Sequence, residues 1–235
     1  MKCNLFVAAV AAGVMLVSAV SSADTFPDAY LRGSLGYSKL PIINYSTTNL
    51  PPSALVGAGT YNISSKNGYD VGLAFGAQFD NGWRAEGAFD YIHNIAKTLT
   101  AHNTFGSPGS NTIQDVGVTK ATTYMLNGLY DFDFQAVSLT PYLGLGVGVV
   151  SVIHDLQLNF GSGNTEEFCY PAITFAGQGI VGVSYVWSDQ VKLSLDYRYL
   201  HSAKNKLPST FGMFAGTTAN HYAAHRFSIG LTTSI

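Results

Sequence analysis

A histidine and a serine stand side by side at positions 201 and 202, and they could supply the base and the nucleophile of a catalytic site. Such a site needs the base within hydrogen-bond reach of the nucleophile and a third group that orients the base. His201 and Ser202 follow a segment of alternating polarity, and adjacent residues of a strand point to opposite faces. They could meet only if the chain bends, so the sequence predicts that the protein is not an enzyme.

The other histidines raise the question of metal or haem binding. His221 and His225 are four residues apart, which is the spacing of two ligands on one face of a helix. Here they stand at the start of a strand-like segment, so neither a metal site nor a cofactor is predicted. Haem or iron binding by exposed histidines stays an alternative, and the residues concerned are His93, His102, His154, His201 and His221.

Charged residues recur inside segments that are otherwise apolar, with equal numbers of each sign. The basic members are Arg32, Arg84, Lys192, Arg198 and Arg226, and the acidic members are Asp70, Glu86, Asp90, Asp131 and Asp196. An unpaired charge in a narrow interior would be unfavourable, so we expect these groups to pair in one network. Whether they can meet depends on the elements that carry them.

The segment 191–200 shows what kind of element this is. Its odd positions, from Val191 to Tyr199, are apolar or aromatic, and its even positions include Lys192, Asp196 and Arg198. In a strand this spacing creates one apolar face and one polar face. The alternation recurs, and it predicts eight strands near residues 30–38, 69–79, 83–91, 122–132, 142–149, 175–187, 191–200 and 226–235.

The connections between these segments alternate between long and short. The long ones are expected to be loops at 39–67, 95–119, 154–171 and 201–220, and the short ones lie at 80–82, 133–140 and 188–190. Asn81-Gly82 supplies the positive φ that a tight hairpin needs, and no helical periodicity follows the first 23 residues. Strands of about ten residues with this loop pattern predict an all-β fold, an eight-stranded antiparallel transmembrane up-and-down β-barrel.

The ends of the chain and its composition complete the assignment. Residues 1–23 combine Lys2, an apolar run and small residues at 21–23, so we expect a cleaved secretory signal and a barrel domain over 24–235. Only 11% of the 235 residues are charged, while 14 tyrosines and 14 phenylalanines are present. The formal net charge of −2 and the lack of a basic patch argue against a nucleic-acid partner.

Aromatic residues on the apolar faces indicate lipid rather than the core of a soluble sandwich. An inner belt beside the short turns is predicted from Phe79, Trp83, Tyr130, Phe132, Tyr185 and Trp187. An outer belt at the far strand ends is predicted from Tyr37, Tyr91, Tyr124, Tyr199 and Tyr222. Amphipathic rings favour the two membrane interfaces, and a tilted strand from Trp83 to Tyr91 crosses roughly 20 Å. An eight-stranded barrel is just wide enough for side chains to fill, so the charges should form a packed interior, with a conducting pore as the alternative.

With the strands placed, the sequence resembles the small opacity-type outer-membrane proteins, relatives of the OmpA transmembrane domain. The matching pieces are 30–37 (YLRGSLGY), 127–132 (NGLYDF), 141–148 (PYLGLGVG), 196–199 (DYRY) and 225–230 (HRFSIG). The resemblance covers the strands and not the loops. It implies a monomeric surface protein, often an antigen or adhesin, in the outer membrane of a Gram-negative bacterium. The family usually ends on an aromatic residue that the barrel-assembly machinery reads, whereas this sequence ends on Ile235.

The predicted function is therefore structural and interactive, through four long extracellular loops on a rigid scaffold. The expected partners are outer-membrane lipid and lipopolysaccharide, the barrel-assembly machinery and host surface molecules. A small porin or a haem-binding surface protein is the alternative. Some barrels of this size modify lipid A with a serine and a histidine, and His201 with Ser202 is the pair that such an enzyme would use here.

Overall fold

The computed structural model describes residues 28–48, 60–102, 110–132, 138–159, 165–211 and 214–235, so the signal predicted at 1–23 lies outside it. Across these ranges the chain is built from β-strands, and no helix is long and apolar enough to cross a membrane. The strands are β1 (Asp28–Lys39), β2 (Ile43–Thr48), β3 (Thr60–Ser65), β4 (Gly68–Gln78), β5 (Trp83–His102), β6 (Ser110–Asp131), β7 (Leu139–Asn159), β8 (Thr165–Ser188), β9 (Val191–Ser202), β10 (Asn205–Phe211), β11 (Phe214–Asn220) and β12 (Ala223–Ser234).

A ring of eight of these strands closes the sheet. In order around the ring they are β1, β4, β5, β6, β7, β8, β9 and β12, and β12 pairs back with β1. Every pair is antiparallel, and each strand lies beside its neighbour in sequence once the outer strands are set aside. Closure removes the unpaired edges that lipid could not solvate. The predicted eight-stranded antiparallel β-barrel is confirmed.

The burial of each ring strand follows the alternation of its sequence. Along β4, Asp70 is fully buried while Val71 and Leu73 on either side of Gly72 are about half exposed. The short turn after β4 is built as its sequence predicts. Gly82 adopts a φ of 82°, and the side-chain oxygen of Asn81 accepts a hydrogen bond from the backbone N–H of Trp83 at 3.2 Å. The reversal of the chain between β4 and β5, and the face on which each of their residues lies, are therefore set by the local sequence at this hairpin.

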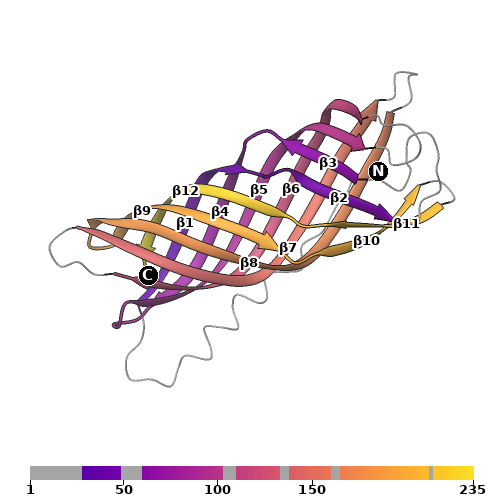
Figure 1. Ribbon diagram of the computed structural model, residues 1–235. Helices are drawn as coiled ribbons and strands as arrows, with labels where there is room; N and C mark the ends of the chain where they lie inside the picture. Colours follow the sequence, from indigo (N-terminus) through magenta and orange to yellow (C-terminus); the bar gives the residue numbers. More distant parts are fainter. Residues whose placement is uncertain (1–27, 49–59, 103–109, 133–137, 160–164, 212–213) are drawn as a thin grey trace.

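The predicted long loops are wrong over much of their length, because strands continue through them. β5 and β6 extend into 95–119, β7 and β8 into 154–171, and the segments 39–67 and 201–220 contain β2, β3, β10 and β11. These four strands form an outer tier in the order β10, β11, β2, β3, and β3 joins it to β5. Figure 1 shows the outer tier at the end of the barrel opposite the C-terminus. Away from lipid neither face must be apolar, so the alternation that reveals a strand in sequence fades there.

Candidate functional site

A fully buried arginine lies between two aspartates in the barrel interior. One terminal nitrogen of Arg226, Nη2, is 2.9 Å from Asp70 Oδ2 and 2.8 Å from Asp90 Oδ1. Its other terminal nitrogen, Nη1, donates a hydrogen bond to Asp90 Oδ2 at 3.0 Å. Ser228 donates to the carboxylate of Asp70 and Thr123 donates to that of Asp90, at 3.1 and 3.0 Å. The cluster takes side chains from β4, β5, β6 and β12, so it can form only when the barrel closes.

A second cluster of charges lies beside the first. Asp196 pairs with Arg32 and also accepts a hydrogen bond from Nε of Arg198 at 2.9 Å. Arg198 Nη2 lies 3.7 Å from Glu86 Oε1, and Asn127 donates to the same oxygen at 2.9 Å. All five side chains are buried. Buried charges persist when they are paired and hydrogen-bonded, which is the arrangement found in both clusters.

Smaller contacts continue this polar layer toward the short turns. Arg84 Nη2 lies 2.8 Å from Asp131 Oδ1, and its guanidinium carbon is 4.8 Å from the centre of the Tyr142 ring. Lys192 instead donates to the neutral side chain of Gln78 at 2.9 Å. Among the described residues, the structure places every predicted charge of the interior in an ion pair except Lys192.

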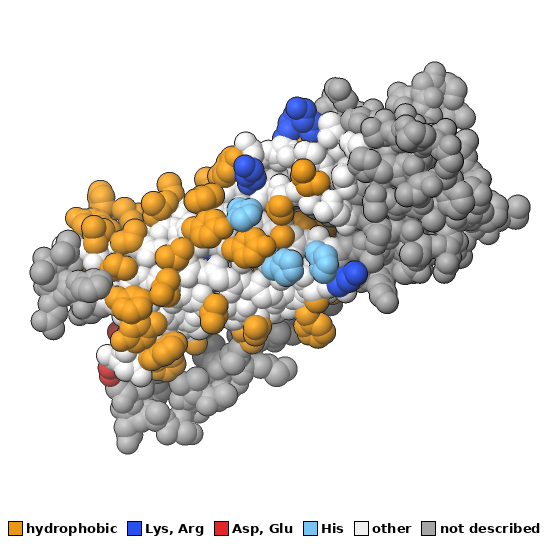
Figure 2. Space-filling view, in the orientation of Figure 1, with side chains coloured by type: hydrophobic (Ala, Val, Ile, Leu, Met, Phe, Trp, Pro, Cys, Tyr) orange, Lys and Arg blue, Asp and Glu red, His pale blue; other side chains and the backbone are white. Residues whose placement is uncertain are grey.

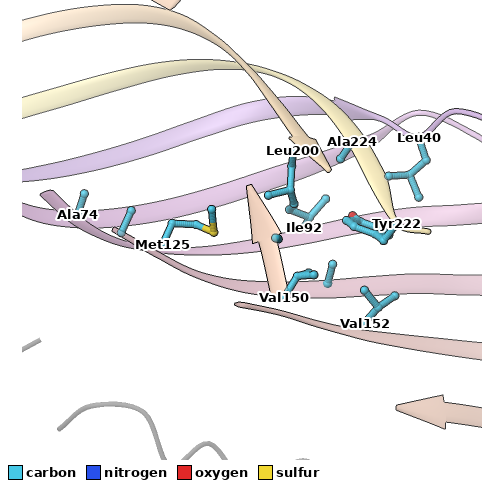
Figure 3. Close-up of a cluster of buried hydrophobic side chains, with 12 residues drawn as sticks. Leu40, Ala74, Ile92, Met125, Val150, Val152, Leu200, Tyr222 and Ala224 are labelled. Atoms are coloured by element: carbon cyan, nitrogen blue, oxygen red, sulfur yellow. The ribbon is translucent and has the colours of Figure 1, made fainter. Parts of the chain in front are cut away.

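An apolar layer fills the interior on the outer side of the charges, which sequence reasoning missed. Ile92, Leu200 and Ala224 are fully buried, and each stands two residues further outward than a buried charge on its own strand. Val150 and Tyr222 pack in the same cluster, as Figure 3 shows. The signal was present in the sequence, because the inward positions of β5, β9 and β12 change there from charged to apolar. The interior is therefore layered: the ion pairs lie nearer the short turns, and hydrocarbon side chains lie directly outward of them.

Tyr222 was predicted in the outer aromatic belt, and this prediction is wrong. Its side chain is 3% exposed and belongs to the apolar layer, because residue 222 has the same parity as the inward residues Ala224 and Arg226. The other belt residues lie on the outer wall, partly or largely exposed. They are Tyr37, Phe79, Trp83, Tyr91, Tyr124, Tyr130, Phe132, Tyr185, Trp187 and Tyr199. Tyr69, 48% exposed, also lies on this wall near the outer end, although the predicted belt did not include it.

Basic side chains begin on the outer wall where the aromatic residues end. Tyr37 and Phe227 are partners across β1 and β12, and two residues further outward the corresponding partners are Lys39 and His225. The same step occurs on β5, where His93 stands two residues beyond Tyr91. There Tyr69 stacks on its partner His93 with ring centres 5.1 Å apart, and Lys120 is the next partner of His93. The two-residue step from an aromatic to a basic residue is visible in the sequence, but the common level of these side chains required the strand register.

The structure separates the histidine and serine that could have formed a catalytic pair. His201 is exposed on the wall, whereas Ser202 is 1% exposed and points inward. The Ser202 hydroxyl accepts the backbone N–H of Tyr222 at 2.8 Å and donates to the carbonyl of Ala203 at 3.0 Å. This hydroxyl therefore joins two chain segments at the outer end of the ring.

The histidines proposed for haem binding do not share one surface. His154 was expected to be exposed, which is wrong, because it is 3% exposed inside the outer part of the barrel. Its Nδ1 lies 3.0 Å from the hydroxyl of Thr119, and burial lowers the pKa of His154 to about 4. His201 and His221 stack on the wall with ring centres 5.7 Å apart. The side chain of His102 lies outside the part of the chain that the structure describes. Among the residues that the structure describes, no cluster of three metal-ligating side chains occurs.

Comparison with known proteins agrees with this architecture. A family model described as an outer membrane protein beta-barrel domain matches residues 7–234. The chain belongs to this family. Outer membrane protein PagN of Salmonella typhimurium strain LT2 is 24% identical over 241 residues, which cover 97% of this chain and 98% of PagN.

Two solved structures share the fold at low identity. Outer membrane protein OprG from Pseudomonas aeruginosa gives a TM-score of 0.60 with 14% identity, covering 89% of this chain and 97% of OprG. Outer membrane protease OmpT from Escherichia coli gives 0.51 with 8% identity, covering 91% of this chain and 99% of OmpT. The protein is therefore an outer-membrane β-barrel of a Gram-negative bacterium, as its sequence predicts.

Proposed function

We propose that the protein is a monomeric, non-conducting surface barrel whose outer tier binds molecules outside the cell, host surface molecules among them. The observation that carries this proposal is the continuation of the sheet beyond the outer aromatic belt. β2, β3, β10 and β11 pair with one another there and join the ring through β3 and β5. A paired sheet holds the segments at its tips far more rigidly than an open loop would, and rigid presentation reduces the entropy lost on binding.

The outer tier also offers a mode of recognition. β10 ends the order of the sheet, and its described pairing partner is β11 alone. The next strand in space is β8, which contacts β10 but forms no ladder with it in the described residues. An edge strand with free backbone groups can pair with an extended segment of another protein. The partner supported by this geometry is a protein with an extended segment that can add a strand to β10.

The filled interior supports a role without conduction. The ion pairs of Arg226 and Arg198 span the middle of the lumen, and the apolar layer of Ile92 and Leu200 lies directly outward of them. An ion would have to break those pairs and then cross hydrocarbon. We therefore expect no stable channels in planar-bilayer recordings, and large, stable conductance steps would contradict this part of the proposal. The outward His201 and the inward Ser202 likewise support a non-enzymatic role.

The binding role can be tested by removing one outer hairpin. A variant in which residues 205–220 are replaced by a short turn loses β10 and β11 but keeps all eight ring strands. We expect bacteria that display this variant to adhere to host cells much less than bacteria that display the intact protein. The matched control replaces the short turn at 188–190, which lies at the opposite end of the barrel.

Both variants must first show the mobility difference between unboiled and boiled samples that a folded barrel gives. Adherence that is unchanged by the loss of β10 and β11, or that falls equally in the control, would refute the proposed role of the outer tier. Protease treatment of intact cells, which should cleave only outer segments, establishes that the tier faces outward.

A further inference from the structure

A shallow groove runs along the outer wall of the barrel beside β1, β9 and β12. It is lined by Lys39, Pro41, Tyr197, His225 and Phe227. The lining is apolar at the end nearer the membrane centre, where Phe227 and Tyr197 are partners across β12 and β9. At the other end it carries a lysine and a histidine that are partners across β1 and β12. The groove is thus amphipathic along the direction of the membrane normal.

A ladder of rings continues the groove outward. Phe227 and Tyr197 have ring centres 4.9 Å apart, and the hydroxyl of Tyr197 lies 2.7 Å from His225 Nδ1. Tyr199 follows with its ring centre 4.9 Å from that of His225, and it stacks in turn on His201 at 6.3 Å. The bond to Tyr197 engages Nδ1, so Nε2 is the nitrogen of His225 that a ligand could reach. The neighbouring rings hold this imidazole in place at the lining of the groove.

The charges on the wall differ in sign between the two ends of the barrel. Exposed basic side chains and histidines of the described chain lie at the outer end, namely Lys39, Lys66, Lys97, His201, Lys204 and His221. Exposed acidic side chains lie at the end with the short turns, namely Asp28, Asp80 and Asp189. Figure 2 shows this separation across the hydrophobic band. The partly exposed Asp155 lies at the outer end too, but it stands on β7, two strands away from β9.

Lys39 and His225 stand at the level where lipid phosphates are expected. Lys39 and His225 stand two residues beyond Tyr37 and Phe227, which corresponds to about 5 Å along the membrane normal for a tilted strand. Aromatic rings mark the headgroup boundary, and basic side chains just beyond it attract anionic lipid. A soluble anion would not need the apolar part of the groove, whereas a lipid would fill both parts.

We infer that this groove binds one molecule of lipopolysaccharide, with an acyl chain along Tyr197 and Phe227 and a phosphate of its lipid A at Lys39 and His225. The inference concerns the outer wall, so it does not depend on adhesion through the outer tier. A bound lipid there would fill the space between the aromatic belt and the outer strands.

Titration of bisphosphorylated lipid A into the folded, detergent-solubilised barrel, followed by native mass spectrometry, tests the inference. The test variant is Lys39→Gln with His225→Gln. The matched control is Lys97→Gln with His93→Gln, which removes the same residue types from β5 on another part of the wall. We expect the test variant to bind about tenfold more weakly and the control to bind as the intact protein does. Dephosphorylated lipid A should bind the intact protein as weakly as lipid A binds the test variant.

Equal losses in the two double variants, or equal binding of the two forms of lipid A, would overturn the inference. A measurement on the unmodified protein provides an independent check that needs no variant to fold. A photoreactive lipid A analogue should crosslink to peptides that contain residues 37–41 and 221–227. Crosslinks concentrated on other strands would show that the phosphate lies elsewhere.

Discussion

Replacing Arg226 by methionine isolates the energetic role of the interior charges. The guanidinium is fully buried and lies within 3 Å of both Asp70 and Asp90. Methionine fills much of the same volume without charge, so the two carboxylates would remain buried with no cation between them. Ser228 and Thr123 could still donate one hydrogen bond to each carboxylate, which compensates only part of the lost interaction.

Removal of one partner from a buried ion pair typically destabilises a protein by about 3–5 kcal/mol, because it leaves an uncompensated charge. We expect a loss in this range for Arg226→Met. Replacement of a whole buried cluster by neutral groups is often close to neutral. The triple variant that also carries Asp70→Asn and Asp90→Asn should therefore recover most of the loss and unfold within about 1–2 kcal/mol of the original protein.

Urea unfolding of the barrel in lipid vesicles, followed by tryptophan fluorescence and gel mobility, measures these differences. Arg84→Met serves as the comparison, because Arg84 pairs with the single carboxylate of Asp131 and its side chain is 10% exposed. Water can solvate part of the broken pair there, so the loss should be smaller. If Arg226→Met loses less than Arg84→Met, or if the triple variant is no more stable than Arg226→Met, the paired network does not stabilise the interior as argued.

Three further predictions follow from the local geometry. Acidification from pH 7 to 4 should destabilise the outer end of β7, because burial lowers the pKa of His154 to about 4 while the unfolded ring titrates near 6.5. The contribution of the neutral His154 ring to the free energy of local unfolding is complete above about pH 6.5 and falls by about 3 kcal/mol as the pH approaches 4. Hydrogen exchange measures this loss, and the variant His154→Phe should lack the pH dependence. Gly72→Ala should lose about 1–3 kcal/mol in urea unfolding, since its new methyl group would meet Asp90 and lie 2.6 Å from Ser34 Oγ. Gly87→Ala, with nothing within 4 Å, is its control, and equal losses would contradict the argument. Gly82→Ala should lose about 1 kcal/mol, because a φ of 82° is unfavourable with a side chain, and unchanged urea unfolding would contradict this.

The alternation of polar and apolar residues was sufficient to predict the ring strands, and the aromatic residues at the strand ends identified the medium as a membrane. Each face of a ring strand meets a different environment, lipid outside and side chains inside, so every position must be apolar or polar according to its face. The turn at Asn81-Gly82 was also predictable, because its backbone conformation depends on two adjacent residues. The outer strands were predicted as loops, since their pairing depends on partners such as β3 with β5 and on no local pattern.

The candidate sites show the same difference between features that local sequence predicts and features that depend on distant partners. Equal numbers of interior charges indicated pairing, but the sequence could not assign Asp70 and Asp90 to Arg226 or place Lys192 beside Gln78. These partners come from strands that are far apart in sequence and meet only through closure and register. The error for Tyr222 has a different, local origin, because residue 222 shares the parity of Arg226, which the sequence already places on the inward face.

The sequence by itself determined the number of ring strands and the face of most residues, because those properties follow from neighbours one and two positions away. It also identified the membrane as the medium, through the aromatic residues at the strand ends. Tertiary structure alone decided which charges pair, where the apolar layer closes the interior, how far the sheet extends outward and which wall residues share a level. These properties depend on strand register around a closed ring, and register couples residues separated by most of the chain.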